Sequence, residues 1–161
     1  MIEEILGLGF DTIEISHGIR SSQLEGILAA REKYQFSISS VHNFLPMPVE
    51  VQTDSPDCYE FTSLRAADRD RATKLSRITI DWAAELGAPF VVVHTGRIRE
   101  LKLTAPLQKM VTDGKFLSRA FVKKRLDAIQ SREKVSEQYN QLILGCLGEL
   151  AAYAGKKGVC L

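Results

Sequence analysis

The sequence lacks the features that would commit it to a membrane, to secretion or to a disulfide framework. No apolar run approaches the roughly 20 residues that a bilayer-spanning helix needs. The N-terminal segment MIEEILGLGF is acidic and has no basic lead of the kind that opens a signal peptide. The three cysteines (Cys58, Cys146 and Cys160) are odd in number and show no CxxC spacing. We therefore expect a cytoplasmic chain with reduced thiols, no membrane partner and no structural zinc site.

An excess of charge of one sign is also absent, since the formal net charge is only +1. No overall field draws the chain to nucleic acid, and we do not expect nucleic acid as a partner. One stretch, residues 115–134, nevertheless holds seven basic residues against Asp127 and Glu133, with Phe116 and Phe121 as its aromatics. We interpret it as a solvated helix face, with contact to phosphate as the alternative.

What the sequence does have is an ordinary globular balance, with 45% apolar and 25% charged residues in 161 positions. That length supports one domain with a core of its own. We expect a single domain over residues 1–161.

The hydrophobic pattern changes period several times along the first half. Residues 1–7 are typical of the end of a helix, and residues 10–16 alternate as a strand does. Ser22, with Glu25 three positions later, predicts the start of a second helix through a capping box. Residues 36–44 are rich in β-forming residues and predict a second strand.

The second half continues the alternation. Residues 46–63 carry three prolines and predict a long loop, and residues 65–86 predict a helix closed by Gly87. Residues 89–94 predict a third strand, and residues 97–135 are charged and predict helix with a break near residues 112–115. The apolar stripe expected on the 65–86 helix comprises Leu75, Ile78, Trp82, Ala83 and Leu86.

The last predicted helix is the clearest, and the final residues VCL predict a further strand. Its apolar positions recur with helical spacing: Tyr139, Leu142, Ile143, Cys146, Leu147, Leu150, Ala151 and Ala154. Strands that alternate with helices at this spacing predict an α/β fold built on a parallel sheet.

The chain's three histidines all lie at or just beyond the ends of successive predicted strands. Glu14 and His17 belong to the first strand's end, His42 and Asn43 to the second's, and His94 to the third's. The carboxyl ends of parallel strands share one edge, and ligands bind at that edge in α/β folds. These residues therefore predict a ligand site.

Imidazole and carboxylate side chains fit two kinds of chemistry there. Neutral histidine binds divalent metals or moves protons near neutral pH, and Glu14 could orient a histidine, accept a substrate hydroxyl or act as a base. Gly96 lets the backbone after His94 turn sharply. The alternative is that Glu14 and His17 are solvated loop residues, and we prefer it for His17, which lies beyond the strand.

Three segments, LGLGFDTIEIS, SISSVHNFLP and ITIDWAAELGAPFVVVHTG, resemble the xylose isomerase-like TIM-barrel superfamily. This group includes sugar phosphate isomerases and epimerases, and apurinic endonucleases of the endonuclease IV type. The resemblance implies barrel strands two to five at residues 10–16, 36–42, 89–94 and 158–161. The chain would then be about half of a (β/α)8 barrel, since a full barrel needs about 250 residues.

The resemblance also implies site residues and a cofactor. It suggests His42 and His94 as metal ligands, and Glu14, His42, Asn43, His94 and Arg97 as substrate-binding residues. A divalent metal (Mn, Zn or Mg) serves the full family site, although this chain alone is expected to hold it poorly or not at all. The first strand and a glutamate expected on strand five are missing, so we expect a truncated member or a fragment. Its unpaired strand edges predict a homo-oligomer.

Three functions remain open for the chain. The first is a sugar or sugar-phosphate isomerase or epimerase, using metal-assisted proton transfer next to a carbonyl, with little activity in this chain alone. The second is an apurinic-site endonuclease that cleaves a phosphodiester with a metal. The third is a non-catalytic half-barrel module. The catalytic residues and the identity of the sugar stay unassigned.

Overall fold

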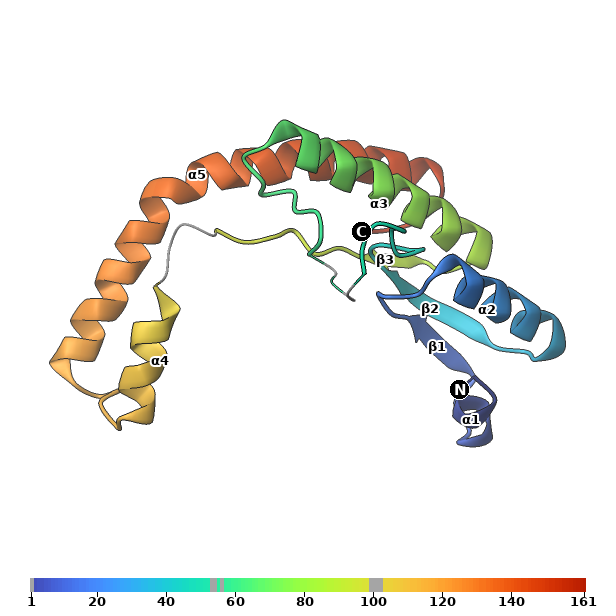
Figure 1. Ribbon diagram of the computed structural model, residues 1–161, viewed down its shortest axis with the longest axis horizontal. Helices are drawn as coiled ribbons and strands as arrows, with labels where there is room; N and C mark the ends of the chain where they lie inside the picture. Colours follow the sequence, from blue (N-terminus) through green and yellow to red (C-terminus); the bar gives the residue numbers. More distant parts are fainter. Residues whose placement is uncertain (1, 53–54, 56, 99–102) are drawn as a thin grey trace.

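A computed structural model of the chain describes residues 2–52, 55, 57–98 and 103–161, and in it helices and strands alternate (Figure 1). The strands are β1 (Thr12–Ile15), β2 (Ser37–His42) and β3 (Phe90–Val92). The helices are α1 (Ile2–Gly7), α2 (Ser21–Lys33), α3 (Ala66–Leu86), α4 (Thr104–Thr112) and α5 (Arg119–Lys156). The prediction of an α/β fold is confirmed.

The three strands form one parallel sheet in the order β1-β2-β3. Thr12 pairs with Ser37 at the start of β1, and His42 pairs with Val92 where β2 and β3 both end. Cys160 forms a single parallel bridge with Phe90, the first residue of β3. Consecutive parallel neighbours of this kind are compatible with a segment of a barrel wall, and their carboxyl ends lie together.

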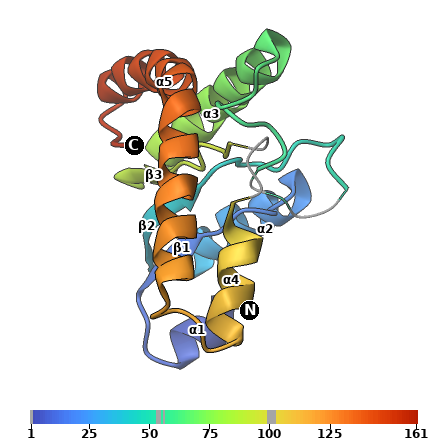
Figure 2. The same cartoon turned by 90° about the vertical axis from the view of Figure 1, so that its left-hand side faces the viewer.

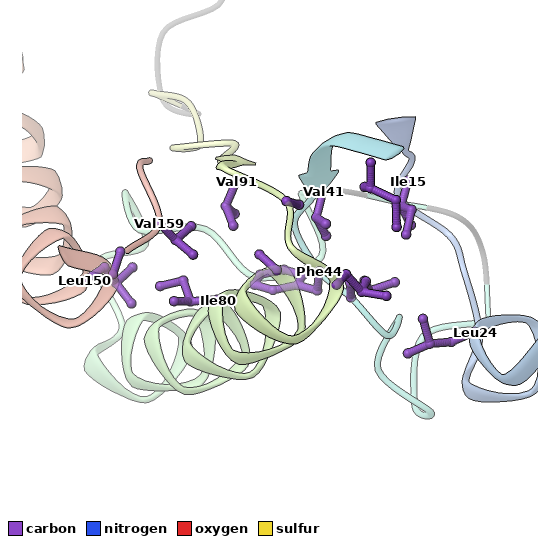
Figure 3. Close-up of a cluster of buried hydrophobic side chains, with 14 of the residues drawn as sticks. Ile15, Leu24, Val41, Phe44, Ile80, Val91, Leu150 and Val159 are labelled. Atoms are coloured by element: carbon purple, nitrogen blue, oxygen red, sulfur yellow. The ribbon is translucent and has the colours of Figure 1, made fainter. Parts of the chain in front are cut away.

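The core lies between this sheet and the helices that cover one of its faces (Figure 3). Val41 and Val91 point from the sheet toward α3, and Ile80 on α3 is fully buried between them and α5. The chain after β2 is fixed to α3 by polar contacts within this core. Thr79 Oγ1 accepts a hydrogen bond from the backbone N–H of Leu45 at 2.9 Å. These contacts hold the carboxyl end of β2 in place.

Two local predictions are wrong. The first turn of α2 is capped by Arg20, whose backbone N–H donates to the side chain of Gln23 at 2.9 Å, so Ser22 lies inside the helix. Ile78 is 40% exposed, because it lies outside the buried face of α3, which consists mostly of smaller residues. That face consists of Ala72, Ser76, Thr79, Ile80, Ala83 and Leu86. Small side chains let the helix approach the sheet and the 43–47 segment closely.

α5 is a single helix of 38 residues and begins much earlier than the apolar repeat after Tyr139 suggests. Its C-terminal part runs beside α3, where Leu150 and Ala154 are buried. Its N-terminal part leaves the body of the molecule and has α4 beside it, as both views show (Figures 1 and 2). The break predicted near residues 112–115 is the turn between these two helices.

Two smaller findings concern the cysteines and the membrane. Cys58, Cys146 and Cys160 are all free thiols. Among the described residues, no helix combines the length and the apolar character that crossing a membrane requires.

Candidate functional site

The three histidines meet at the carboxyl edge of the sheet. The ring of His42, the last residue of β2, has its centroid 4.9 Å from that of His94 and 5.2 Å from that of His17. The rings of His17 and His94 are 6.4 Å apart. Three segments that are distant in sequence thus bring their imidazoles into one cluster, because the parallel strands all end at this edge.

The interpretation of His17 as a solvated loop residue is therefore wrong. Its ring is half-buried and packs edge-on against both other rings, at interplanar angles of 77° and 79°. The chain turns back at Gly18, whose φ of 84° favours glycine, and this turn keeps His17 over the sheet edge. All three histidines lie at or just beyond the ends of successive predicted strands, and this regularity could have placed His17 in the site from the sequence alone.

His42 lies in the middle of the cluster, and one of its ring nitrogens is buried without a hydrogen-bond partner among the described residues. That nitrogen is Nδ1. Burial lowers the pKa of His42 below the ordinary 6.5, the neighbouring His94 lowers it further, and the carboxylate of Glu14 opposes both. His42 is therefore neutral at pH 7 and offers one ring nitrogen as a donor and the other as an acceptor.

Glu14 lies on the same sheet edge, on β1, and its side chain is held by the neighbouring strand. Ser40 Oγ donates a hydrogen bond to Glu14 Oε2 at 2.5 Å. Ser40 is itself buried, whereas Glu14 is exposed. This contact orients the carboxylate while leaving it open to a ligand.

Part of the predicted 46–63 loop, none of whose residues was assigned to the site from the sequence, runs alongside the end of β3. Asp57 Oδ1 lies 3.2 Å from His94 Nδ1, and Thr62 Oγ1 accepts the backbone N–H of Arg97 at 3.0 Å. Gly96, at φ 102°, has no room for a side chain, since a Cβ there would come within 2.2 Å of Thr62 Oγ1. The 57–62 segment is thereby fixed against residues 94–97. The long loop gave no such signal in the sequence, because these contacts depend on how it folds back.

Two of the predicted substrate-binding residues direct their side chains to partners outside the imidazole cluster. Asn43 is 1% exposed, and its Nδ2 donates to Ser76 Oγ on α3 at 2.8 Å. Arg97 is largely exposed, and its Nε forms an ion pair at 3.2 Å with the buried carboxylate of Glu60. The structure therefore groups Glu14, His42 and His94, but it turns Asn43 toward the core and Arg97 toward Glu60.

A hollow of about 400 Å³ adjoins the site on the side of Arg97. It lies between the segment that follows Asp57 and the long helix α5. Its lining includes Tyr59, Glu60, Thr62, Arg65, Arg97 and Tyr139. The three histidines are not among its lining residues, so the hollow extends the polar edge and does not enclose the imidazole cluster.

The fit of the cluster to a metal ion is incomplete. In the part of the chain that the structure describes, no group of three or more His, Cys, Asp or Glu side chains is arranged to hold a metal. Two imidazoles fill only half of the tetrahedral sphere that zinc prefers. The described residues therefore do not form a metal site by themselves, and His42 and His94 as metal ligands stay a prediction.

Comparison with known proteins agrees with the geometry. The family model described as "Xylose isomerase-like TIM barrel" matches residues 2–161. The chain belongs to the xylose isomerase-like TIM-barrel family. Among curated protein sequences, none matches this chain.

The fold of this family member is also similar to that of a solved structure. It is the crystal structure of a D-tagatose 3-epimerase-like protein, which superposes with a TM-score of 0.60 at 19% sequence identity. The match covers 98% of this chain and 45% of that protein. This xylose isomerase-like chain thus spans slightly less than half the length of the neighbour, as expected for part of a barrel.

Proposed function

We propose that the chain forms part of the substrate site of a sugar or sugar-phosphate isomerase or epimerase. One observation carries this proposal, the meeting of three imidazoles at the carboxyl edge of the sheet, around a buried Nδ1 of His42 that has no partner among the described residues. Buried polar atoms are normally paired, so an unpaired one at a strand end favours a ligand as its missing partner. Membership of the xylose isomerase-like family supports a sugar as that ligand.

A sugar suits the hydrogen-bonding capacity of this edge. Each hydroxyl of a sugar both donates and accepts, as a neutral imidazole does through its two nitrogens. His42 is neutral because burial lowers its pKa, so it can meet a hydroxyl in either sense. The carboxylate of Glu14 is acceptor-only and suits a hydroxyl that donates.

Asp57 can orient the ring of His94 and fix its tautomer. If Nδ1–H of His94 donates a hydrogen bond to Asp57 Oδ1, as the 3.2 Å distance allows, the Nε2 of His94 is left as an acceptor for the ligand. Asp57 is thus a positioning residue in this proposal, and His42, His94 and Glu14 are binding residues. Proton abstraction next to a carbonyl also needs a base, a role that Glu14 fits by charge and exposure.

The alternative of an apurinic endonuclease receives less support. DNA binding needs cations around the reacting centre. The basic stretch of residues 119–134 lies on the N-terminal part of α5, which projects away from the strands and their histidines (Figure 1). Arg97, which follows His94 by three residues, is paired with Glu60.

Binding by NMR tests the proposal directly. We expect ketopentoses or ketohexoses, or their phosphates, to shift the imidazole resonances of the wild-type chain, and His42→Ala to remove the response. Arg31→Ala, an exposed substitution on α2, serves as the matched control and should bind like the wild type. A wild-type chain whose imidazole resonances ignore the whole sugar panel at millimolar concentration would contradict the proposed function.

A further inference from the structure

The two ends of the molecule are charged oppositely, and both expose apolar side chains. One end is the arm, residues 103–134, which consists of α4, the following turn and the N-terminal part of α5 (Figure 2). The other end is the tip, residues 2–11, which consists of α1 and the chain leading into β1. Figure 1 shows that the two ends turn toward the same side of a crescent.

The arm is basic and carries an apolar face with no partner in the described chain. Six of the fourteen large apolar side chains that the described residues expose belong to it: Val111, Phe116, Leu117, Val122, Leu126 and Ile129. Val122 and Leu126 are 51% and 53% exposed and lie four residues apart, so they share one face of α5. They line a groove of about 410 Å³ together with Leu117 and Lys123.

The charge of the arm is strongly one-sided. Its eight basic residues are Lys109, Lys115, Arg119, Lys123, Lys124, Arg125, Arg132 and Lys134. Its three acidic residues are Asp113, Asp127 and Glu133, and Asp113 already pairs with Lys109 at 3.2 Å. Arg119, Lys123 and Asp127 all line the groove, so cations outnumber acidic residues around the apolar face, as they do in the arm as a whole.

The tip has the complementary character. Its charged residues are Glu3, Glu4 and Asp11, with no basic residue among them. Leu8 and Phe10 are 76% and 61% exposed, so an apolar surface stands beside these carboxylates. Lys33 on α2 balances Glu3 at 3.3 Å, which leaves the tip acidic overall.

We propose that the arm of one copy binds the tip of a second copy, so that two chains form a symmetric dimer. A two-fold rotation across the open side of the crescent brings each arm to the partner's tip, and closes two equivalent contacts. Apolar faces meet in both contacts, and opposite charges surround them. This inference is independent of the sugar site, since it uses none of the site residues.

Charge reversal separates this arrangement from other modes of association. We expect the quadruple variant Arg119→Glu, Lys123→Glu, Lys124→Glu and Arg125→Glu to be monomeric, because its arm, with four basic and seven acidic residues, then faces an acidic tip. We expect Glu4→Lys with Asp11→Lys to be monomeric for the converse reason. Mixing the arm variant with the tip variant should restore a dimer, since both arm–tip contacts in the mixed pair again join opposite charges.

Sedimentation velocity provides the readout, with circular dichroism to confirm folding of each variant. The wild type should dimerise more weakly as salt rises, because exposed charges are screened. Leu126→Asp should abolish the dimer, while Val49→Asp, at a position that is 88% exposed elsewhere, should not. A wild type that is monomeric at all concentrations overturns the proposal, as does a mixture of the two charge variants that stays monomeric. A monomer that instead binds duplex DNA through Lys123 and Lys124 would overturn it in favour of nucleic acid.

Discussion

The two parts of α5 are one continuous helix in two different surroundings. In the C-terminal part, Leu150 and Ala154 are buried against α3 and the sheet, and Glu149 pairs with Arg77 across the interface. In the N-terminal part, before residue 135, no residue is buried. The comparison teaches that a helix can continue beyond its packing partners, whereas the stabilising contribution of each part depends on what that part packs against.

The same contrast between open and packed surroundings separates two glycine turns, one in the arm and one in the site. The turn at Gly114 in the arm has open space around it, while the turn at Gly96 in the site is closely packed by Glu60 and Thr62. Both glycines have positive φ values, of 71° and 102°. One glycine therefore serves only its own backbone conformation, and the other also makes room for a neighbouring segment.

The largest expected effect concerns the buried part of α5. We expect Leu150→Ala to lower the free energy of unfolding by about 2–5 kcal/mol, because it leaves a cavity at a fully buried position. Leu126→Ala in the arm should cost less than about 0.5 kcal/mol, since that side chain is half-exposed. Urea unfolding at protein concentrations low enough to keep the chain monomeric measures both. Equal losses would break the comparison between the two parts of the helix.

The next effect concerns the two glycines. Gly96→Ala should cost about 2–4 kcal/mol, because it adds a left-handed backbone penalty and an overpacked contact with Thr62. Gly114→Ala should cost only about 1–2 kcal/mol, from the backbone penalty alone. Thermal and urea unfolding of both variants would test the difference. A Gly114→Ala variant as unstable as Gly96→Ala would show that packing at the site contributes nothing.

The smallest effect is the pH dependence that His42 contributes. Its pKa in the folded chain lies below the 6.5 of an exposed histidine, so the unfolded chain binds the extra proton first as the pH falls. The free energy of unfolding should therefore decrease below about pH 6.5 and be insensitive to His42 above that value. His42→Asn should lose part of this decrease.

NMR titration of the His42 ring gives the direct check. The resonance should titrate with a midpoint below 6.5, because the ring is partly buried beside a second imidazole. A midpoint at or above 6.5 would contradict the neutral role assigned to this residue. Glu14→Gln should lower the midpoint further, since that carboxylate is the charge that favours protonation.

Much of the fold follows from local pattern. The residues that alternate in period 2 form β1, and the stretch rich in β-forming residues contains β2. The helix that ends at Gly87 does so with that glycine at φ 70°, and Pro46 and Pro48 lie in a loop after β2. These outcomes are local because hydrophobic period, glycine conformation and proline geometry act on neighbouring residues. The resemblance of the three quoted segments to the xylose isomerase-like family implied successive strands of a barrel, and the sheet order β1-β2-β3 and the family match agree with it.

The candidate site was predictable only in outline. The sequence places histidines at strand ends, and parallel pairing brings such ends to one edge. It does not show that His17 turns back over that edge, that Asn43 faces α3, or that Asp57 reaches His94. Each of these depends on contacts between residues more than 20 positions apart, which no local pattern records.

The sequence by itself therefore determined most of the elements of this protein and their order, because period and turn residues are properties of short stretches. The tertiary structure alone decided which side chains share a surface. It made a cluster of the three histidines, because three parallel strands end together, and it divided α5 into a buried half and an exposed arm, because α3 and the sheet reach only one end of that helix.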